Sequence, residues 1–461
     1  MNNATQIKTL LTGLLLAVST STASAQPASE TQLTDKVEAP AASDSDSIGT
    51  VHTHGPRHLR MALEAAAIQG IGTAWYWRNT GGGWGESNRV DWQLGFKGSA
   101  LMAKLDGSGW RNDGNPYAIN ALAHPMSGSL TFYVARSNGY SPLGAFAVSS
   151  MISVSWELFT EWAEYGAPND LLSTSPVGFS VGEAAYQIRH NWKRTNKQLS
   201  LGAGATDGDA FLSLGGRLSL DTIPTDEGAG VVVGGKKVNV GLEVPFDGHV
   251  RAIEAGAKSS IVGYYHNGAN HRLFTGASSE FYFRNQNQRE SRNWDHLTTV
   301  SVGPTVDAQL RLTDDATLDL GTDLYAEFGM LKAEAFDQWR TDHPMAIVRN
   351  TMQDKADPYY YAYGVAVTPR INVAYKGLNL GGKVAAHALK SMNGIDRDQE
   401  MMTADPSMRD TDATAEAWLA YSHKSMTFAV DGRAHRRDGK IEEARSSQTN
   451  TTTMVSVAYN R

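Results

Sequence analysis

The sequence predicts a mainly β protein: an antiparallel transmembrane β-barrel of about twelve strands that follows an N-terminal α-helical module. Apolar and polar residues alternate strictly over residues 300–312 and 318–328, with a short turn at residues 313–315. Each arm can cross a bilayer, which takes about 9–11 residues in a strand. An export signal and a regular alternation of short and long connections are the other two observations that predict this fold.

The N-terminal segment has the pattern of a secretory signal. Residues 1–25 carry Lys8, the apolar run Leu10–Val18 and a cleavage pattern at Ala23–Ala25. The apolar run is too short for a transmembrane helix, so these residues are excluded from the fold. Residues 26–55 are rich in Ala, Ser, Pro, Thr, Asp and Glu, and we expect them to form a disordered periplasmic linker.

The composition excludes several classes of protein. The 461 residues contain no cysteine, which excludes a disulfide framework, a thiolate metal site and a lipid anchor. The net charge of -7 argues against a nucleic-acid partner. Mean hydropathy is -0.35, and no apolar run of about 18 residues follows the signal, so helical membrane spans are not expected. A closed barrel is then the structure that satisfies the backbone of an exported, membrane-crossing chain.

Residues 56–193 predict the helical module, and within it Gly109–Ile188 differs in pattern from everything that follows. Their apolar residues recur mainly at helical rather than alternating spacing. Asn138-Gly139 suits a helix stop, and Pro176 limits the regularity of the last helix. The expected elements are helices over residues 56–69, 117–137 and 142–165 and from Pro168 onward, and an additional strand over residues 90–96.

Polar residues within 109–188 are the candidate functional residues. Glu157 and Glu161 lie four apart on an otherwise apolar helix and need partners, for which His124 and Arg136 are the obvious candidates. A buried polar network that locks the helices together is the favoured interpretation, and a reactive or ligand-binding cluster is the alternative. The catalytic candidates are His124, Ser127, Glu157 and Glu161; the ligand-binding candidates are Arg136, Asn138, Trp156, Asn169, Asp170 and Glu183.

A string of short motifs in this block is similar to a known family. The motifs are Asn115-Pro116, His124-Pro125, Gly128-Ser129, Tyr133, Ala135–Gly139, Trp156-Glu157, Glu161, Asn169–Leu171 and Gly182-Glu183. They resemble the signature of the bacterial domain of unknown function 3943, over Trp110 to Ile188. The resemblance implies export and association with the outer membrane, and it implies no established activity. The chain departs from the family pattern between Glu161 and Asn169 and at Ser175–Gly178.

Alternating segments continue from about residue 194 to the C-terminus and predict the barrel. The candidate strands are 197–204, 209–220, 236–244, 250–265, 271–284, 297–312, 315–329, 359–376, 378–390, 412–424, 426–437 and 452–460. Short turns are expected near residues 267–270, 313–314, 377 and 425, and long loops over 285–296, 330–358, 391–411 and 438–451. Short periplasmic turns and long external loops are typical of outer-membrane barrels, whereas a soluble barrel, the alternative, has no reason to sort its loops.

The barrel register also assigns side chains to its two faces. The residues expected in the lumen have mixed charge, which favours cross-strand ion pairs over a selective pore. They are Asp307, Arg311, Asp319, Asp323, Glu327, Arg370, Lys383, Glu416, Asp431, Arg433 and His435. Tyr359, Tyr360, Tyr361 and Tyr363 cluster near the external end of one strand and are interpreted as part of an aromatic girdle.

Two functions from different classes fit these observations. The first is an outer-membrane envelope protein that binds or passes an amphiphilic or small polar ligand, with the helices as a plug or docking module. The second is a lipid-modifying hydrolase centred on His124, Ser127 and Glu157. His423-Lys424-Ser425 falls at a periplasmic turn and is set aside. No metal site and no cofactor are expected; the expected partners are outer-membrane lipids, a small-molecule or lipid ligand, and the barrel-assembly machinery during biogenesis.

Overall fold

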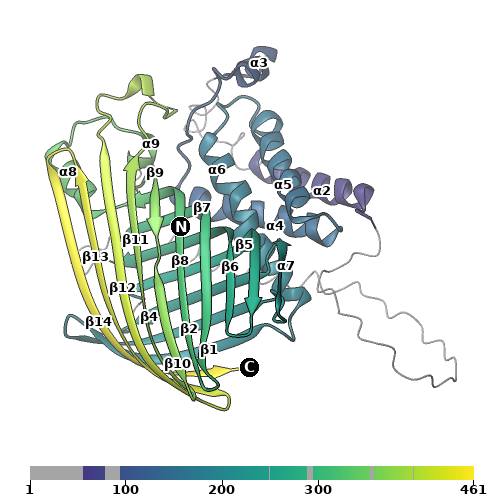
Figure 1. Ribbon diagram of the computed structural model, residues 1–461. Helices are drawn as coiled ribbons and strands as arrows, with labels where there is room; N and C mark the ends of the chain where they lie inside the picture. Colours follow the sequence, from purple (N-terminus) through teal and green to yellow (C-terminus); the bar gives the residue numbers. More distant parts are fainter. Residues whose placement is uncertain (1–54, 78–93, 249, 288–293, 354–357, 398) are drawn as a thin grey trace. The chain divides into compact units, whose positions relative to one another are not determined.

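The computed structural model of the chain describes residues 55–77, 94–248, 250–287, 294–353, 358–397 and 399–461 (Figure 1). The predicted signal peptide and nearly all of the predicted linker lie outside these residues. The helical elements before the barrel are α2 (His58–Tyr76), α3 (Gly98–Asp106), η3 (Ile119–Ala123), α4 (His124–Ser137), α5 (Pro142–Ser155), η4 (Trp156–Thr160), α6 (Pro168–Val177), η5 (Gly178–Gly182) and α7 (Glu183–His190). Shorter elements lie between strands: α8 (Glu334–Asp342), α9 (Asn350–Gln353) and η6 (Gln399–Met401).

Local sequence explains the helical hairpin that the chain was expected to form. Gly139 has a φ of 87°, a conformation that glycine adopts at little cost, and it lies just past the end of α4. Ser141 then caps α5 by accepting a hydrogen bond of 3.1 Å from the backbone N–H of Gly144, with Pro142 in the first turn. The predicted additional strand over 90–96 is wrong for residues 94–96, which form no strand; residues 90–93 lie outside the described part.

The strands begin at residue 196 and follow the predicted segments closely. They are β1 (Asn196–Thr206), β2 (Asp209–Asp221), β3 (Gly228–Val233), β4 (Lys237–Phe246), β5 (Ala252–Gly268), β6 (His271–Asn287), β7 (Trp294–Thr313), β8 (Ala316–Lys332), β9 (Tyr360–Val367), β10 (Arg370–Tyr375), β11 (Leu378–Ser391), β12 (Met408–His423), β13 (Met426–Ile441) and β14 (Ala444–Asn460).

These strands form one closed antiparallel sheet. β3 and β4 both pair with β5, and β9 and β10 both lie between β8 and β11, so each of these two pairs is one interrupted strand. The fourteen labelled strands therefore make a wall of twelve. β1 pairs with β14, for example Leu199 with Tyr459, which closes the barrel and leaves no free edge. The predicted barrel of about twelve strands is confirmed.

The two edges of the barrel carry different connections. One edge, here called the turn edge, has short connections at residues 269–270, 314–315, 376–377 and 424–425. The opposite loop edge has the long connections over residues 333–359 and 392–407. The predicted loop over 438–451 is wrong, because β13 and β14 continue to a two-residue turn at 442–443 on the loop edge. Polar residues occupy both faces of these extensions, so apolar alternation could not reveal them.

Side chains on the concave face of the wall form ion pairs across the lumen. Arg433 on β13 contacts Glu254 on β5 at 2.9 Å and Glu416 on β12 at 2.7 Å. Lys258 on β5 contacts Asp323 on β8 at 2.5 Å. The predicted cross-strand ion pairing is confirmed, and pairs such as Arg433–Glu254 also brace strands that are distant in the order of the sheet.

The convex face of the wall is apolar and exposed over much of the barrel. Large exposed apolar residues there come from many strands: Leu199, Leu201, Leu214, Leu242, Val302, Val306, Leu324, Val365, Ile371, Leu380, Leu419, Phe428, Val430, Val455 and Val457. A soluble protein does not leave so large a contiguous apolar surface in water. An apolar exterior around a charged interior is the arrangement of a barrel that crosses a bilayer.

The helical module packs on this convex face and not in the lumen. The wall residues beneath it include Phe281, Val300 and Phe328, which form one cross-strand row and contact Tyr117 and Val177 in one buried cluster. Their sequence neighbours point the opposite way, into the lumen: Ser301 donates to Glu327 at 2.8 Å, and Glu327 contacts His387 at 3.0 Å. Successive side chains of a strand face opposite sides of the sheet. The helices therefore cover the outside of the wall.

This placement corrects two predictions. A module that plugs the lumen is wrong, because the helices contact the convex side of the wall at Phe281, Val300 and Phe328. The aromatic girdle is wrong for Tyr359, Tyr360 and Tyr361, which are at most 2% exposed, whereas Tyr363 is 52% exposed. The helices cover Tyr359 and Tyr361 on the convex face, and Tyr360 packs under the loop-edge segment that contains α8 and α9.

Candidate functional site

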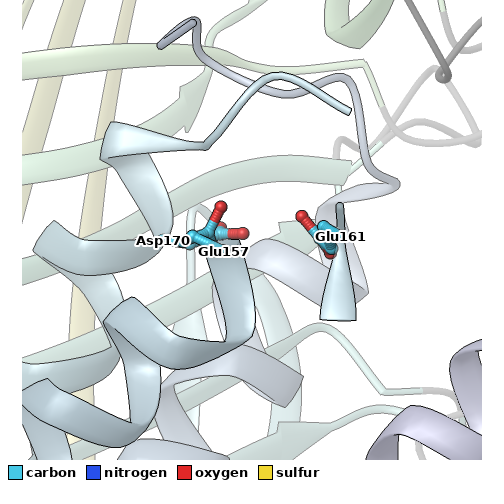
Figure 2. A group of neighbouring side chains, drawn as sticks. All are labelled: Glu157, Glu161 and Asp170. Carbon is cyan, nitrogen blue, oxygen red and sulfur yellow. The ribbon is translucent and has the colours of Figure 1, made fainter. Parts of the chain in front are cut away.

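Three carboxylates meet inside the helical module. Glu157 and Glu161 come from η4 and the residue after it, and Asp170 comes from the first turn of α6. Each offers an oxygen that lies within 4.8 Å of the others, and all three residues are buried (Figure 2). The wide π-helical turn of η4 brings Glu157 and Glu161 to this point, and such turns are often found at functional sites. We call Glu157, Glu161 and Asp170 the carboxylate triad.

Hydrogen bonds hold one oxygen of each triad member. The backbone N–H of Ala167 donates to Glu157 Oε2 at 2.7 Å, and the indole N–H of Trp156 donates to Glu161 Oε1 at 3.0 Å. The amide of Asn169 donates to Asp170 Oδ1 at 2.8 Å. The donors fix the orientation of the carboxylates, and Oδ2 of Asp170 accepts no hydrogen bond from the described residues.

Burial raises the pKa values of all three triad members. The pKa values of Glu157 and Asp170 are held well above the usual range, because burial disfavours the charged form and the neighbouring carboxylates repel it. The pKa of Glu161 is also raised, again mainly by burial. Asp113 adds a fourth carboxylate whose charge raises the pKa of each member. The three carboxylates are therefore unfavourable in their ionised form unless protons or a positive charge neutralise them.

Among the described residues, the nearby cations offset the charge of the triad only in part. The ammonium of Lys104, which is buried, donates to the backbone carbonyls of Glu157 and, at 2.7 Å, of Glu161. Burial lowers the pKa of Lys104. Arg397 from the loop edge contacts Glu164, a carboxylate outside the triad, at 3.1 Å. These contacts neutralise the surroundings of the triad more than the triad itself.

His124 lies at the border of the triad. Its Nε2 is 3.5 Å from Asp170 Oδ2, and neither atom has a hydrogen-bond partner among the described residues. Burial lowers the pKa of His124, which favours the neutral imidazole. A neutral imidazole nitrogen beside carboxylate oxygens is a donor set that metal ions use in proteins.

A polar network links the triad to the barrel wall. Asn169 donates to Asp113 at 3.0 Å, and the hydroxyl of Tyr361 on the barrel donates to the same carboxylate at 2.6 Å. Asn120 also donates to Asp113 at 2.6 Å and to the hydroxyl of Tyr359 at 2.9 Å. The site is thus held by the wall as well as by the helices.

Arg136 and Glu183 form a second cluster and correct a predicted partnership. Arg136 was expected to pair with Glu157 or Glu161, but its Nε donates to Glu183 Oε2 at 2.7 Å. Glu183 Oε1 also accepts from the backbone N–H of Gly235 on the wall at 3.0 Å. Asn138 lies just past the C-terminal end of α4, where it donates to Glu64 of α2 at 2.6 Å. These residues fasten the helices to one another and to the wall.

The predicted hydrolytic constellation is not assembled. Ser127 is exposed, and its hydroxyl donates to the backbone carbonyl of His124 at 3.1 Å, whereas the imidazole of His124 faces Asp170. A serine nucleophile needs its base within hydrogen-bond reach of the hydroxyl. His423 and Ser425 lie at the β12–β13 turn, away from the module in the topology.

Sequence reasoning missed four residues that surround the triad. Lys104, Asp113, Glu164 and Arg397 lie outside or between the motifs that drew attention, and none has a spacing that signals a site. The one available signal was the charge on Lys104 in the otherwise apolar segment Leu101–Leu105. Arg397 could not have been linked to the module from the sequence, because it belongs to a loop between two barrel strands.

Comparison with known families supports the predicted resemblance. Residues 109–208 match the family described as Domain of unknown function (DUF3943). This segment contains the triad, His124, the Arg136–Glu183 pair and the first strand of the barrel. No curated protein matches the chain.

Solved structures similar to the chain include outer-membrane porins. The NanC porin aligns at 8% identity and a TM-score of 0.28, over 57% of this chain and 98% of the porin. The KdgM porin aligns at 12% identity and a TM-score of 0.23, with the same coverage. The outer membrane channel DcaP of Acinetobacter baumannii aligns at 13% identity and a TM-score of 0.23, over 58% of this chain and 96% of the channel. Values this low transfer neither a ligand nor an activity to this chain.

Proposed function

We propose that this protein is an outer-membrane β-barrel that binds an amphiphilic ligand through a helical docking module held in the lipid beside its wall. The observation that carries the proposal is the position of the module on the convex face, against Phe281, Val300 and Phe328. Because the same face is exposed and apolar elsewhere, the remainder of the module borders the lipid.

The outer surface of the module is suited to lipid. The helical stretch Pro142–Thr160 is long enough and apolar enough to cross a membrane, and only 28% of its most apolar 18 residues are buried inside the protein. Its exposed face carries Leu143, Met151 and Phe159, which are each at least 60% exposed. Leaving these side chains in water would cost about 1.5–3 kcal/mol each relative to burial. Acyl chains would cover them.

An amphiphile fits this surface because apolar and charged groups lie close together. Phe159 is exposed on η4, whereas Glu157 of the same turn is buried in the triad. An acyl chain on the α5 face would place a polar head group near the border of the site, where His124 is partly exposed. Passage through the lumen is the less favoured function, because ion pairs such as Arg433–Glu254 and Arg284–Asp412 join distant strands across it.

The location follows the same argument. The signal pattern of residues 1–25, the apolar convex face and the segregation of long loops to one edge together support insertion in a bacterial outer membrane, with the loop edge outside. The mature protein should fractionate with outer membranes and migrate differently on gels before and after heating. Recovery as a soluble periplasmic protein would contradict the proposal.

Spin labelling tests the position of the module directly. The chain has no native cysteine, so Met151→Cys introduces a single attachment site. In vesicles of phosphatidylethanolamine and phosphatidylglycerol, the label at residue 151 should collide with oxygen more than with a water-soluble nickel chelate, as a label at Val455 on the wall should. A label at Arg436, which is on the exposed extension of β13, should show the reverse. Equal nickel accessibility at residues 151 and 436 would refute lipid contact.

A photoactivatable phosphatidylethanolamine tests ligand binding. It should label residues 142–160 of the parent protein, and Phe159→Asp should reduce that labelling strongly. Leu419→Asp is the matched control, because Leu419 is an exposed apolar residue of the wall on β12, outside the module. Equal losses in the two variants would show general lipid contact instead of a docking site.

A further inference from the structure

The carboxylate triad has the spacing of a metal-binding site. Oxygens bound to one ion at about 2.1 Å lie about 3.0 Å apart when adjacent and about 4.2 Å apart when opposite. The three triad oxygens already lie within 4.8 Å of one another, so small side-chain rotations bring them to these separations. Glu157 lies in η4, Glu161 directly follows it, and Asp170 lies in the first turn of α6.

A second observation points to a cation at the triad. Asp170 is 1% exposed, and its Oδ2 accepts no hydrogen bond from the described residues. Nε2 of His124 lies 3.5 Å from this oxygen, and this buried nitrogen also has no hydrogen-bond partner among the described residues. A buried polar atom without a partner destabilises the folded protein, and a charged one does so more strongly. An ion between these groups would satisfy both atoms.

The donors around the triad have the arrangement of an outer coordination shell. Asn169, the indole of Trp156 and the N–H of Ala167 each hold one oxygen of a triad carboxylate, and Oδ2 of Asp170 accepts no hydrogen bond from the described residues. Outer-shell donors of this kind orient metal ligands and are important for affinity. We propose that Glu157, Glu161 and Asp170 bind one divalent metal ion, with His124 beside them as an additional ligand.

The donor set selects the kind of ion. Three carboxylates favour hard cations such as Mg²⁺ and Mn²⁺, and an imidazole nitrogen favours a transition metal such as Mn²⁺ over Mg²⁺. The site has no thiolate, because the chain has no cysteine. The proposal does not rest on the lipid contact of the module, and it revises the expectation that the chain has no metal site.

Manganese titration of the full-length protein in detergent tests the proposal. After treatment with EDTA, the protein should take up one Mn²⁺ per chain, seen as loss of the free-ion signal in electron paramagnetic resonance. Asp170→Asn and Glu161→Gln should each weaken binding by more than about 100-fold, and the outer-shell variant Asn169→Ser by about 10–100-fold. Heat-dependent gel migration and circular dichroism identify the variants that fold.

Glu164→Gln is the matched control. Glu164 is a buried carboxylate of the same module, but it contacts Arg397 and lies outside the triad. This variant should bind Mn²⁺ as the parent does. The proposal is overturned if the parent binds no Mn²⁺, in which case protons alone neutralise the triad, or if folded Asp170→Asn or Asn169→Ser binds as tightly as the parent. It is also overturned if Glu164→Gln weakens binding as much as Asp170→Asn.

Discussion

Removal of the Glu183 carboxylate should loosen the helical module, because it leaves the buried charge of Arg136 without its partner. Arg136 and Glu183 have side chains that are 6% and 0% exposed, and two of their atom pairs lie at 2.7 and 3.3 Å. Breaking a buried pair from one side costs about 3–5 kcal/mol. Local opening of α4 and α7 in the Glu183→Ala variant should therefore increase between about 100-fold and a few thousand-fold.

Hydrogen exchange of the full-length protein in detergent measures this opening. Amides of α4 and α7 should lose protection in Glu183→Ala, whereas Glu183→Gln should lose less, because its side-chain oxygen can still accept from the N–H of Gly235. Barrel amides such as those of β12 and β13 should be unaffected.

The Arg60–Glu64 pair supplies the control. It has a similar separation of 2.7 Å but side chains that are 54% and 33% exposed, and exposed pairs at this spacing on a helix contribute about 0.3–0.5 kcal/mol. Arg60→Ala should therefore change exchange by no more than about twofold. If Glu183→Ala also changes it by no more than about twofold, the buried pair does not hold the module and our reasoning is refuted.

Three further predictions concern the wall, the lumen and pH. Tyr361→Phe removes a buried hydroxyl that donates to Asp113, and it should destabilise the module by about 1–3 kcal/mol. The measurement is the protease sensitivity of residues 98–190, and the control is Tyr363→Phe, because Tyr363 is exposed. Equal sensitivity in the two variants would contradict a stabilising contact between Tyr361 and Asp113. Arg433→Ala removes the cation that joins Glu254 and Glu416 across the lumen, so cation conductance in planar bilayers should rise above that of the parent. Unchanged conductance would argue against a lumen narrowed by this ion pair. Burial raises the pKa of Glu164 to about 7, above its usual value of 4.5, so between these two pH values the folded module holds a proton that the unfolded chain releases. Protonated Glu164 therefore stabilises the module fully below about pH 4.5, and this stabilisation is lost as the pH rises through 7. Protection of the module from protease should fall between about pH 5 and 8 in the parent and less in Glu164→Gln, and an identical fall in both would exclude Glu164 as the cause.

The barrel could be predicted because its signal is local. In residues 300–312, the alternation of apolar and polar residues predicts which side of the sheet each side chain faces. Closure of the barrel does not change this pattern in any one strand. The prediction failed at residues 438–451, where Arg436 and Asp438 pair with each other on the convex face and Arg437 pairs with Asp410 on the concave face. A strand with charge on both sides carries no apolar alternation.

The helical module was predicted in outline for similar reasons. Asn138-Gly139 and Ser141-Pro142 are local stop and start signals, and the structure has the hairpin there. The motif residues Glu157, Glu161 and Asp170 were selected, but as separate candidates and with Arg136 as an expected partner. The structure instead places Arg136 on Glu183 and brings the three acids together.

The sequence by itself determined the strand periodicity, the sorting of most loops, the helical hairpin and the list of candidate polar residues, since each depends on residues close together in the chain. Only the tertiary structure decided that the helices lie outside the wall, that Tyr361 faces Asp113, and that Lys104 and Arg397 reach the acidic site. The physical reason is that an apolar convex wall can be covered equally by lipid or by helices, and alternation in the strands is the same in both cases. Which surface covers it depends on the shape and polar contacts of segments distant in sequence.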